Sequence, residues 1–443
     1  MNADDTIAAI ATAPGRGAVG IVRVSGPGVR TIAHHIIGEL PTPRTAAYRT
    51  VRNLSSDTID HAIAIYYPAP RSFTGEDVLE IHTHGGRVVT REVLHCIVDS
   101  GARVALPGEF SKRAFLNGKI DLLQAEAIAD LIDSNSTRAA RLAQQSLSGA
   151  FSQRIIDIDG DLKYVRVHIE ANIDFPEDDI PSETIRALVS RTASVRKKLT
   201  HLLSDAQNGA RLNRGIDVAI VGKPNVGKST LLNQLAREDR AIVDPRPGTT
   251  RDVLSVDIEF AGLVVRIHDT AGIRESDDPI EREGVRRARE RIGAADALFH
   301  VYTDDDDDTV THGVDDAVPV FNIRNKIDLL GLPASLTTQG NVSQVDLSAR
   351  SGEGVDLLER AVLERFHLDG DHDSIVLARD RHLTALKAAC SALDFDAVRL
   401  FSEAPELAAE QLRVAGYELG RLLGEFTSED LLGEIFSSFC IGK

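Results

Sequence analysis

The side chains best suited to chemistry lie in four short motifs between Gly222 and Asp328. The first, Gly222-Lys-Pro-Asn-Val-Gly-Lys228-Ser229, fits the phosphate-binding loop pattern. Its glycines let backbone N–H groups close around phosphates, Lys228 supplies a positive charge, and the Ser229 hydroxyl can reach Mg²⁺. An apolar run precedes the loop and a helical pattern follows it, which is the context that this motif requires.

The three later motifs supply the remaining parts of a nucleotide site. Thr250 is a candidate switch threonine in a Gly-Thr-Thr sequence, and Asp269 ends a strand-like run, where it can hold the water shell of the metal. In Asn325-Lys326-Ile-Asp328, the last carboxylate can accept hydrogen bonds from both ring N–H donors of guanine, a contact that adenine cannot return. Four such motifs in this order predict a GTPase.

The attacking water needs a group to orient it, and Ras-type GTPases use a glutamine that directly follows the third motif. Here that position is Ile273, which cannot orient water. We therefore expect an acid of the following segment, or a partner, to take this role. The candidate acids are Glu275, Asp277, Asp278, Glu281 and Glu283.

The composition is that of an ordinary globular protein of several domains. The chain has 443 residues, of which 42% are hydrophobic and 26% are charged. No apolar run approaches the roughly 20 residues of a membrane helix, and the N-terminus lacks a basic signal sequence, so we expect a cytoplasmic protein without membrane spans. Three widely spaced cysteines, Cys96, Cys390 and Cys440, match no disulfide framework or metal motif.

The formal net charge of −17 argues against tight binding of nucleic acid by this chain alone. The charge is uneven, because residues 1–118 contain 12 basic and 11 acidic side chains, and the excess of acids lies in the remainder. If RNA is the substrate, a basic partner is expected to provide much of the contact.

The hydrophobic patterns divide the chain into three domains. Residues 1–118 show short alternating runs separated by Gly and Pro turns, as in an α+β domain. Helical periodicity dominates 119–214 and returns in 368–443, whereas 215–367 alternates strand and helix patterns, as in a doubly wound α/β fold. We expect the α/β GTPase domain to be inserted into a discontinuous α-helical domain.

Two other patterns do not support a further cofactor. Gly15-Arg-Gly17-Ala-Val-Gly20 matches the dinucleotide fingerprint, but it leads into a strand instead of opening a helix. His82 and His84 could share one face of a strand, yet no third metal ligand with suitable spacing is apparent.

Several further motifs extend over the rest of the chain. They are Asp5-Thr-Ile7, Ala13-Pro-Gly-Arg-Gly17, Ser72-Phe-Thr-Gly-Glu-Asp-Val78, Pro107-Gly-Glu-Phe-Ser-Lys-Arg-Ala-Phe-Leu-Asn117, Asp121-Leu-Leu-Gln-Ala-Glu-Ala127 and the terminal Phe439-Cys-Ile-Gly-Lys443. Together with the GTPase motifs, they make the chain similar to the MnmE (TrmE) family of tRNA modification GTPases over essentially its whole length.

The resemblance implies a multidomain homodimer. Its N-terminal α+β domain would bind tetrahydrofolate and dimerise, and its α-helical central domain would carry an inserted, Ras-like doubly wound GTPase domain. With an FAD-dependent MnmG-type partner, in a heterotetramer, such proteins install an aminomethyl or carboxymethylaminomethyl group at C5 of the wobble uridine in certain tRNAs. The one-carbon unit comes from tetrahydrofolate, in its 5,10-methylene or 5-formyl form, and GTP hydrolysis depends on Mg²⁺ and K⁺.

The resemblance also implies roles for individual residues. Folate-binding positions are Arg23, Glu80, Lys119 and Lys443, and Glu281 matches the catalytic acid that orients water. Mg²⁺ ligands are Ser229 and Thr250, and K⁺ positions are Asn225, Asp244, Arg246 and Thr249. The GTP-binding positions are Asn225, Val226, Gly227, Lys228, Ser229, Thr230, Asp244, Pro245, Arg246, Pro247, Gly248, Thr249, Thr250, Asp269, Thr270, Ala271, Gly272, Asn325, Lys326, Asp328, Ser348 and Ala349.

Two segments depart from the family pattern, and two other functions are alternatives to the main interpretation. Pro245 and Pro247 stiffen the loop that would donate carbonyl groups to K⁺, and Arg350 stands where a lysine is usual after Ser348-Ala349. A GTPase of ribosome assembly without modification chemistry is one alternative function, and a folate-dependent aminomethyl transferase with a regulatory GTPase is another. The identity of the tRNAs, the choice of glycine or ammonium and the role of Cys440 remain open at this level.

Overall fold

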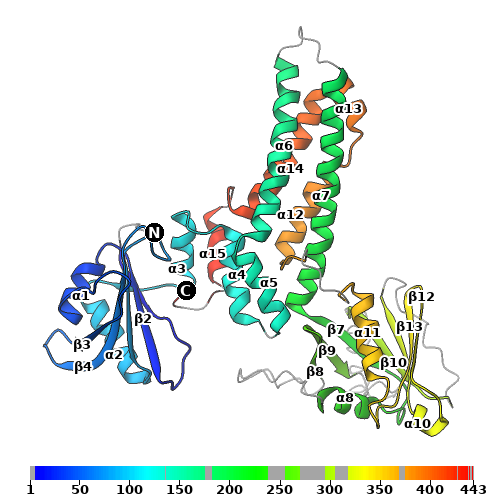
Figure 1. Cartoon of the computed structure of the whole chain (residues 1–443), viewed down its shortest axis with the longest axis horizontal. Helices are drawn as coiled ribbons and strands as arrows, with labels where there is room; N and C mark the ends of the chain where they lie inside the picture. The colour runs from blue at the N-terminus through cyan, green and yellow to red at the C-terminus, as the bar shows by residue number, and fades with distance from the viewer. Residues whose placement is uncertain are drawn as a thin grey trace, which may run out of the picture. The chain divides into compact units, whose positions relative to one another are not determined.

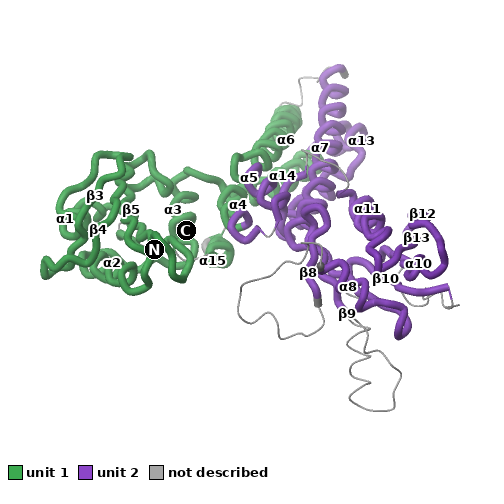
Figure 2. The backbone as a smooth tube through the Cα atoms, turned by 60° about the horizontal axis from the view of Figure 1, so that its bottom comes forward, with its two compact units in different colours: residues 1–129, 147–173, 406–443 green, residues 130–146, 174–405 purple. Residues whose placement is uncertain are grey.

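The computed structural model describes residues 5–134, 136–174, 182–237, 255–269, 295–304, 318–368, 375–426 and 428–437, together with Phe439 and Gly442. The chain forms two compact units (Figures 1 and 2). Unit 1 comprises Met1–Ala129, Leu147–Ile173 and Glu406–Lys443, and unit 2 comprises Asp130–Ser146 and Asp174–Pro405. No helix in the described ranges is long and apolar enough to cross a membrane.

Unit 1 contains a six-stranded sheet in the order β3-β4-β5-β2-β1-β6. The strands are β1 (Ile7–Ile10), β2 (Val19–Ser25), β3 (Ala47–Arg52), β4 (Thr58–Tyr67), β5 (Val78–His84) and β6 (Arg103–Val104). Only the β1–β6 pair is parallel among the described pairs of this sheet. The glycine-rich segment 15–20, which matches the dinucleotide fingerprint, leads into strand β2 and not into a helix, as expected.

The two faces of this sheet differ in chemistry, because side chains alternate along a strand. On one face, apolar residues such as Val22, Val24 and Ile81 form a core with α1 (Val29–Ile37) and α2 (Arg87–Asp99). On the opposite face of β2 and β5, Arg23 pairs in register with Glu80. The Arg23–Glu80 pair therefore lies on the face of the sheet that α1 and α2 do not cover.

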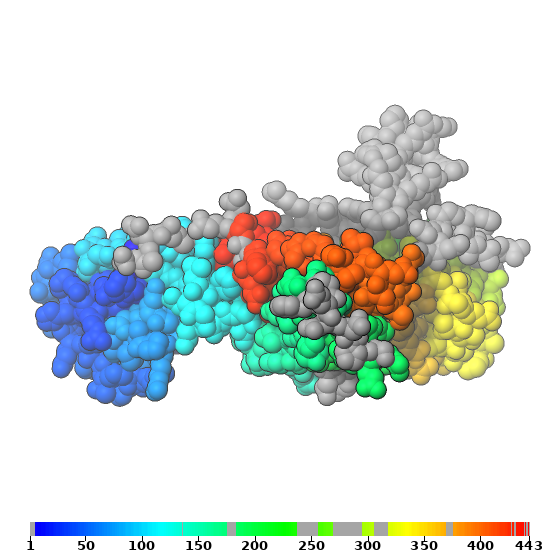
Figure 3. Space-filling view, turned by 90° about the horizontal axis from the view of Figure 1, so that it is seen from above, coloured from blue at the N-terminus to red at the C-terminus, as the bar shows by residue number. Residues whose placement is uncertain are grey.

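The remaining helices of unit 1 include the C-terminal segment of the chain. They are α3 (Glu109–Leu116), most of α4 (Leu122–Asp133), α6 (Ala150–Asp174), α14 (Pro405–Leu423) and α15 (Glu429–Ser437). Leu122 and Ala125 of α4 form a core with Phe436 of α15 and with Phe439. In Figure 3 the C-terminal helix accordingly lies beside the cyan segment that leads into α4.

Unit 2 contains a seven-stranded sheet in the order β12-β13-β11-β10-β7-β9-β8. Its strands are β7 (Ile216–Val221), β8 (Ser255–Phe260), β9 (Leu263–Asp269), β10 (Ala297–Tyr302), β11 (Val320–Arg324), β12 (Ser335–Gln339) and β13 (Val342–Asp346). The five central strands are parallel, and β8 and β12 are antiparallel edges. Helices α8 (Lys228–Arg237) and α11 (Val355–Arg365) contribute buried residues to the core of this sheet.

Further helices of unit 2 are α5 (Thr137–Leu147), α7 (Ser182–Arg214), α12 (Asp380–Ala392) and α13 (Ala397–Glu403). Helix α7 contacts α12 and α13. A Cβ at Gly209 of α7 would lie 1.9 Å from the carbonyl oxygen of Val376, so glycine allows the segment before α12 to approach the helix. The predicted fold class, with an α+β domain, helices and a doubly wound domain, is confirmed; the predicted boundaries between domains divide the chain differently from the two units and stay predictions.

Candidate functional site

The phosphate-binding loop lies at the carboxyl edge of the parallel strands. The order of the strands places β9 on one side of β7 and β10 on the other, so the loop after β7 is at the switch point of the sheet, where ligands of doubly wound folds bind. Gly222 has φ +146°, and a Cβ there would lie 2.1 Å from the carbonyl oxygen of Val301 in β10. Only glycine permits this close crossing.

The contacts of Lys228 and the start of α8 favour a phosphate group at this loop. The Nζ of Lys228 donates to the carbonyl oxygens of Gly222 (2.6 Å) and Lys223 (2.8 Å), and its side chain is buried under the loop. Ser229 and Thr230 are exposed in the first turn of α8. The first N–H groups of a helix have no intrahelical acceptor, so they and Lys228 together favour an anion at this point.

Asn325 joins three loops of the same edge through its side-chain amide. Its Nδ2 donates to the carbonyl oxygen of Val226 (2.8 Å), and its Oδ1 accepts from the backbone N–H groups of Lys326 (2.8 Å) and Ala349 (2.9 Å). The residue is 2% exposed. Because a Cβ at Gly227 would lie 2.2 Å from this amide, glycine is needed beside it.

The carboxylate expected to recognise guanine is held by a serine from another loop. The Oγ of Ser348, which is fully buried, donates to Oδ1 of Asp328 at 2.7 Å. The Nζ of Lys326 donates to the carbonyl oxygen of Asn225 at 2.8 Å. Thus the structure brings together the expected GTP-binding residues of the phosphate loop, of the Asn-Lys-Ile-Asp motif and of the 348–349 loop.

The expected metal ligands are described only in part. Asp269 is the last residue of β9 and pairs with Ile220, directly before the phosphate loop, which places its backbone at the same edge as Ser229. The other expected positions lie outside the described residues. They are Asp244, Pro245, Arg246, Pro247, Gly248, Thr249 and Thr250, Thr270, Ala271 and Gly272, and the catalytic candidate Glu281 with the other candidate acids.

A second constellation lies on the open face of the sheet in unit 1. The Arg23 guanidinium forms an ion pair with Glu80, with Nε at 2.9 Å and Nη2 at 2.8 Å from Oε1. Its Nη1 donates to the carbonyl oxygen of Gly442 at 3.4 Å. The same guanidinium lies 5.9 Å from the ring centre of Phe73 and 5.7 Å from that of Phe110. A cation, a carboxylate and two aromatic rings therefore meet on one patch.

This patch fits a flat heterocycle that carries hydrogen-bond donors. The second oxygen of Glu80 faces Nε2 of His82 at 3.4 Å, and both side chains remain partly exposed. Lys119 is held differently, since its Nζ donates to the carbonyl oxygen of Pro70 at 3.1 Å. Lys443 lies outside the described residues. Of the four expected folate-binding residues, Arg23 and Glu80 form an ion pair with each other. The ammonium group of Lys119 contacts the segment that precedes Phe73.

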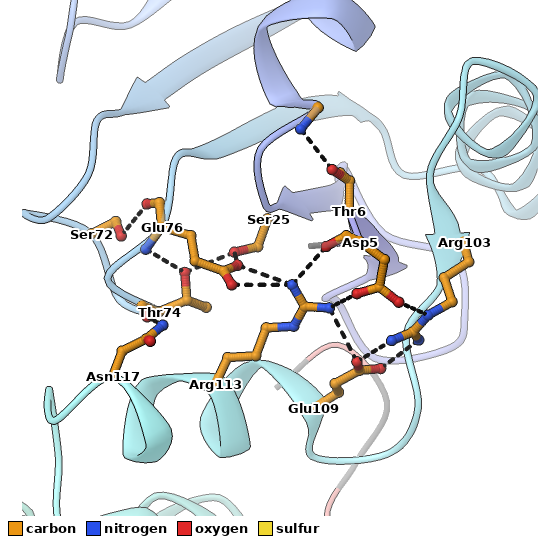
Figure 4. A network of polar contacts seen from close by, with 11 residues as sticks. Asp5, Thr6, Ser25, Ser72, Thr74, Glu76, Arg103, Glu109, Arg113 and Asn117 are labelled. Carbon is orange, nitrogen blue, oxygen red and sulfur yellow. Dashed lines mark hydrogen bonds and ion pairs between the residues drawn. The ribbon is translucent and has the colours of Figure 1, made fainter. Parts of the chain in front are cut away.

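A partly buried ionic network connects α3 to the sheet of unit 1 (Figure 4). Arg113 of α3 donates to Asp5 (2.5 Å), to Glu76 (3.1 Å) and to Glu109 (3.3 Å), and Arg103 also binds Asp5 and Glu109. Burial by itself would raise the pKa values of Glu109 and Asp5, but their hydrogen bonds to Arg103 and the charges of both arginines hold these pKa values below the ordinary range.

Sequence reasoning did not assign a role to this network. Its members come from three of the quoted motifs, which contain Asp5, Glu76 and Arg113, but charge spacing alone does not reveal that they meet. The network fixes the 72–78 segment as well, because the Ser25 hydroxyl donates to Glu76 at 2.7 Å and contacts the Thr74 hydroxyl at 2.7 Å. The network thereby positions the loop that contains Phe73.

Comparison with known proteins places both halves of the chain in one family. Residues 6–119 match the model of the GTP-binding protein TrmE N-terminus, and residues 122–440 match the model of the MnmE helical domain. The tRNA modification GTPase MnmE of Methylococcus capsulatus is 47% identical over 442 residues, 99% of each chain, and that of Proteus mirabilis is 45% identical over the full length of both. A crystal structure of Aquifex aeolicus Era bound to GDP and aluminium fluoride is 27% identical, with a TM-score of 0.26, over 40% of this chain and 66% of the Era chain.

Proposed function

The chain belongs to the MnmE family of tRNA modification GTPases, and from this premise we propose how it acts on tRNA. It hydrolyses GTP and, with an FAD-dependent MnmG-type partner, installs an aminomethyl or carboxymethylaminomethyl group at C5 of wobble uridine. A tetrahydrofolate, bound in the N-terminal domain of a homodimer, supplies the one-carbon unit. The observation that carries the folate part of the proposal is the Arg23–Glu80 pair beside Phe73, Phe110 and the C-terminal Gly442.

The chemistry of this patch suits a reduced folate. The pterin ring offers N–H donors, which a carboxylate such as Glu80 accepts, and its flat ring packs against aromatic side chains. The glutamate end of folate is anionic and requires cations, for which Lys119 and Lys443 are the proposed partners. Arg23 both holds Glu80 in place and adds positive charge beside the ring site.

In the GTPase domain the proposed roles follow the positions on the sheet edge. Lys228 and the loop backbone hold the β- and γ-phosphates, Asp328 recognises guanine, and Ser229, Thr250 and Asp269 hold Mg²⁺ directly or through its water. Asn225, Asp244, Arg246 and Thr249 hold K⁺, which supplies the positive charge that an arginine finger provides in other GTPases. Glu281 orients the attacking water.

Mass spectrometry of tRNA nucleosides from cells that lack the gene tests the proposed function. The C5-modified wobble uridine should disappear, and the intact gene should restore it. Cells that keep the modification while ribosome subunits fail to assemble would instead support the ribosome-assembly function. If cells without the gene lose the modification but cells with the Arg23→Ala variant keep it, the proposed folate site is misplaced and the tRNA function stands.

GTP hydrolysis tests the metal and water assignments. Turnover should be faster in K⁺ than in Na⁺ at equal ionic strength, and equal rates would refute the K⁺ site. Glu281→Ala should lose about 10²–10⁴-fold in turnover while it keeps its nucleotide affinity, because a positioned acid contributes about this much. Glu283→Ala tests a rival candidate acid in the same way: it should hydrolyse GTP at the normal rate, and a loss of turnover in this variant instead of in Glu281→Ala would move the role to Glu283.

A further inference from the structure

The side chains of Arg44 and Lys119 contact the short segment 67–73 of unit 1, which itself contains the exposed Arg71. The Arg44 guanidinium lies 5.8 Å from the ring centre of Tyr67 and donates a hydrogen bond to the carbonyl oxygen of Arg71. Lys119 donates to the carbonyl oxygen of Pro70 at 3.1 Å. Arg44, Arg71 and Lys119 are exposed, and none of them forms an ion pair with a carboxylate within the described part of the chain.

This basic segment continues directly into the proposed folate site. Phe73, at its end, faces Arg23. Tyr67, at its start, lies on the same sheet face as Glu80, because Tyr67 pairs with Val78 and side chains alternate along β5. Burial raises the pKa of Tyr67, and among nearby charges Glu80 raises it further while Arg23 and Arg44 lower it. Tyr67 is therefore within electrostatic reach of both the Arg23–Glu80 pair and Arg44.

The number of cations exceeds what a folate with a single glutamate requires. Such a folate ends in two carboxylates, for which Lys119 and Lys443 are already the proposed partners. Arg23 is occupied by Glu80 and by the carbonyl oxygen of Gly442. Arg44, whose guanidinium lies beside Tyr67, and the exposed Arg71, whose carbonyl oxygen Arg44 contacts, are thus two further arginines of this segment, and guanidinium groups bind carboxylates in a two-point geometry.

We propose that Arg44 and Arg71 bind the γ-linked glutamate tail of polyglutamylated reduced folates. This inference rests on the proposed folate function and names the form of folate that the site prefers. Each additional glutamate adds one carboxylate to an extended chain, and the two arginines provide partners for the first of these beyond the glutamate held by Lys119. The site selects polyglutamates over the monoglutamate by charge, with little change in how the pterin ring is held.

Phosphates of tRNA are the competing ligands for such cations. Three exposed cations neutralise few phosphates, so they contribute only a small part of the affinity that RNA binding normally needs. The 12 basic and 11 acidic side chains of residues 1–118 nearly balance, which gives little attraction for a long polyanion such as tRNA, whereas a short glutamate tail is held together with its pterin ring. These charges favour the folate tail.

Calorimetry on the full-length protein tests the proposal with 5-formyltetrahydrofolate and its triglutamate. The triglutamate should bind about three- to thirtyfold more tightly, a modest gain because exposed ion pairs are individually weak. Arg44→Gln/Arg71→Gln should lose this preference and keep the monoglutamate affinity. The matched control is Arg49→Gln/Arg52→Gln, which removes two positive charges from β3 and should keep the preference.

The outcomes separate this inference from the function on which it rests. If the unchanged protein binds neither folate, the folate function fails and the inference with it. If it binds both folates equally, or if the Arg44/Arg71 variant keeps the preference, only the inference is overturned. If the Arg44→Gln/Arg71→Gln protein keeps the folate preference but binds tRNA more weakly in fluorescence anisotropy, these arginines bind RNA and the inference is overturned.

Discussion

At the scale of single residues, Asn325 has a wider role than guanine-motif spacing suggests. Its one amide group satisfies a carbonyl of the phosphate loop and two backbone N–H groups, one in its own motif and one in the 348–349 loop. Because two of these three hydrogen bonds are buried and the third is partly buried, the amide sets the distance between the phosphate end and the base end of the nucleotide site. Asn325 therefore acts by positioning other groups.

Asn325→Ala should weaken nucleotide binding about 10- to 100-fold. The substitution leaves two buried backbone groups and one partly buried N–H without their partner. Each unsatisfied buried group costs about 1–3 kcal/mol, part of which is recovered when the loops rearrange. Titration with a fluorescent GDP analogue measures the loss. Asn322→Ala is the matched control, because Asn322 lies on β11 and its side chain contacts His300 on β10 instead of the nucleotide loops. Equal affinities of the two variants would contradict this role.

At the scale of elements, helix α3 is attached to the sheet of unit 1 through charges. Glu109 is 1% exposed and binds Arg103 and Arg113, which in turn hold Asp5 and Glu76. A buried carboxylate with two guanidinium partners is stable only as a complete set, since removing one member leaves buried charge without compensation. The orientation of α3, and with it Phe110 at the folate patch, depends on this set.

Glu109→Gln should destabilise α3 by on the order of 3 kcal/mol at pH 7. The pKa of Glu109 in the folded state is lower than its ordinary value, so its contribution is complete above about pH 4.3 and is lost as the pH falls through the folded-state pKa. Hydrogen exchange of α3 peptides, corrected for intrinsic pH dependence, should therefore differ greatly between variant and native protein at pH 7 and converge only as the pH falls below the lowered folded-state pKa of Glu109. Glu410→Gln, in an exposed pair with Arg413, is the control and should change little.

At the scale of the whole molecule, the last residues of the chain belong to the same compact unit as the first. A Cβ at Gly442 would lie 2.5 Å from the carbonyl oxygen of Ile10 in β1, and Phe439 is buried with Phe436. The nucleotide loops belong to the other unit. The C-terminus is therefore anchored beside the proposed folate site, whereas the GTP site is built from residues 222–349.

Deletion of residues 440–443 should weaken binding of 5-formyltetrahydrofolate about 10- to 100-fold and leave GTP affinity unchanged. The deletion removes the Gly442 carbonyl from Arg23 and the proposed charge of Lys443, and one charge-assisted contact contributes about 1.5–3 kcal/mol. Calorimetry with each ligand gives both values on one preparation. Lys443→Ala in the full-length chain separates the charge from the backbone contact, and unchanged folate affinity in both proteins would place the pocket elsewhere.

The sequence by itself was sufficient to predict the fold class, the GTPase motifs and the family. This is possible because these features are local: a phosphate loop needs glycines and a lysine at fixed spacing, and short alternating runs separated by Gly and Pro indicate the α+β domain of residues 1–118. The candidate residues Arg23, Glu80 and Lys119 came from family resemblance, since single charges on a strand carry no such signal.

Only the tertiary structure decided which distant residues meet. The pairing of β2 with β5 brings Arg23 to Glu80, and the packing of α15 places Gly442 against both β1 and Arg23, over 400 positions away in the sequence. The same holds for Asn325 with Val226, and for Arg113 with Asp5 and Glu76. Such contacts depend on strand order and on the packing of whole helices, which are set by buried area across the entire unit and leave no trace in local spacing.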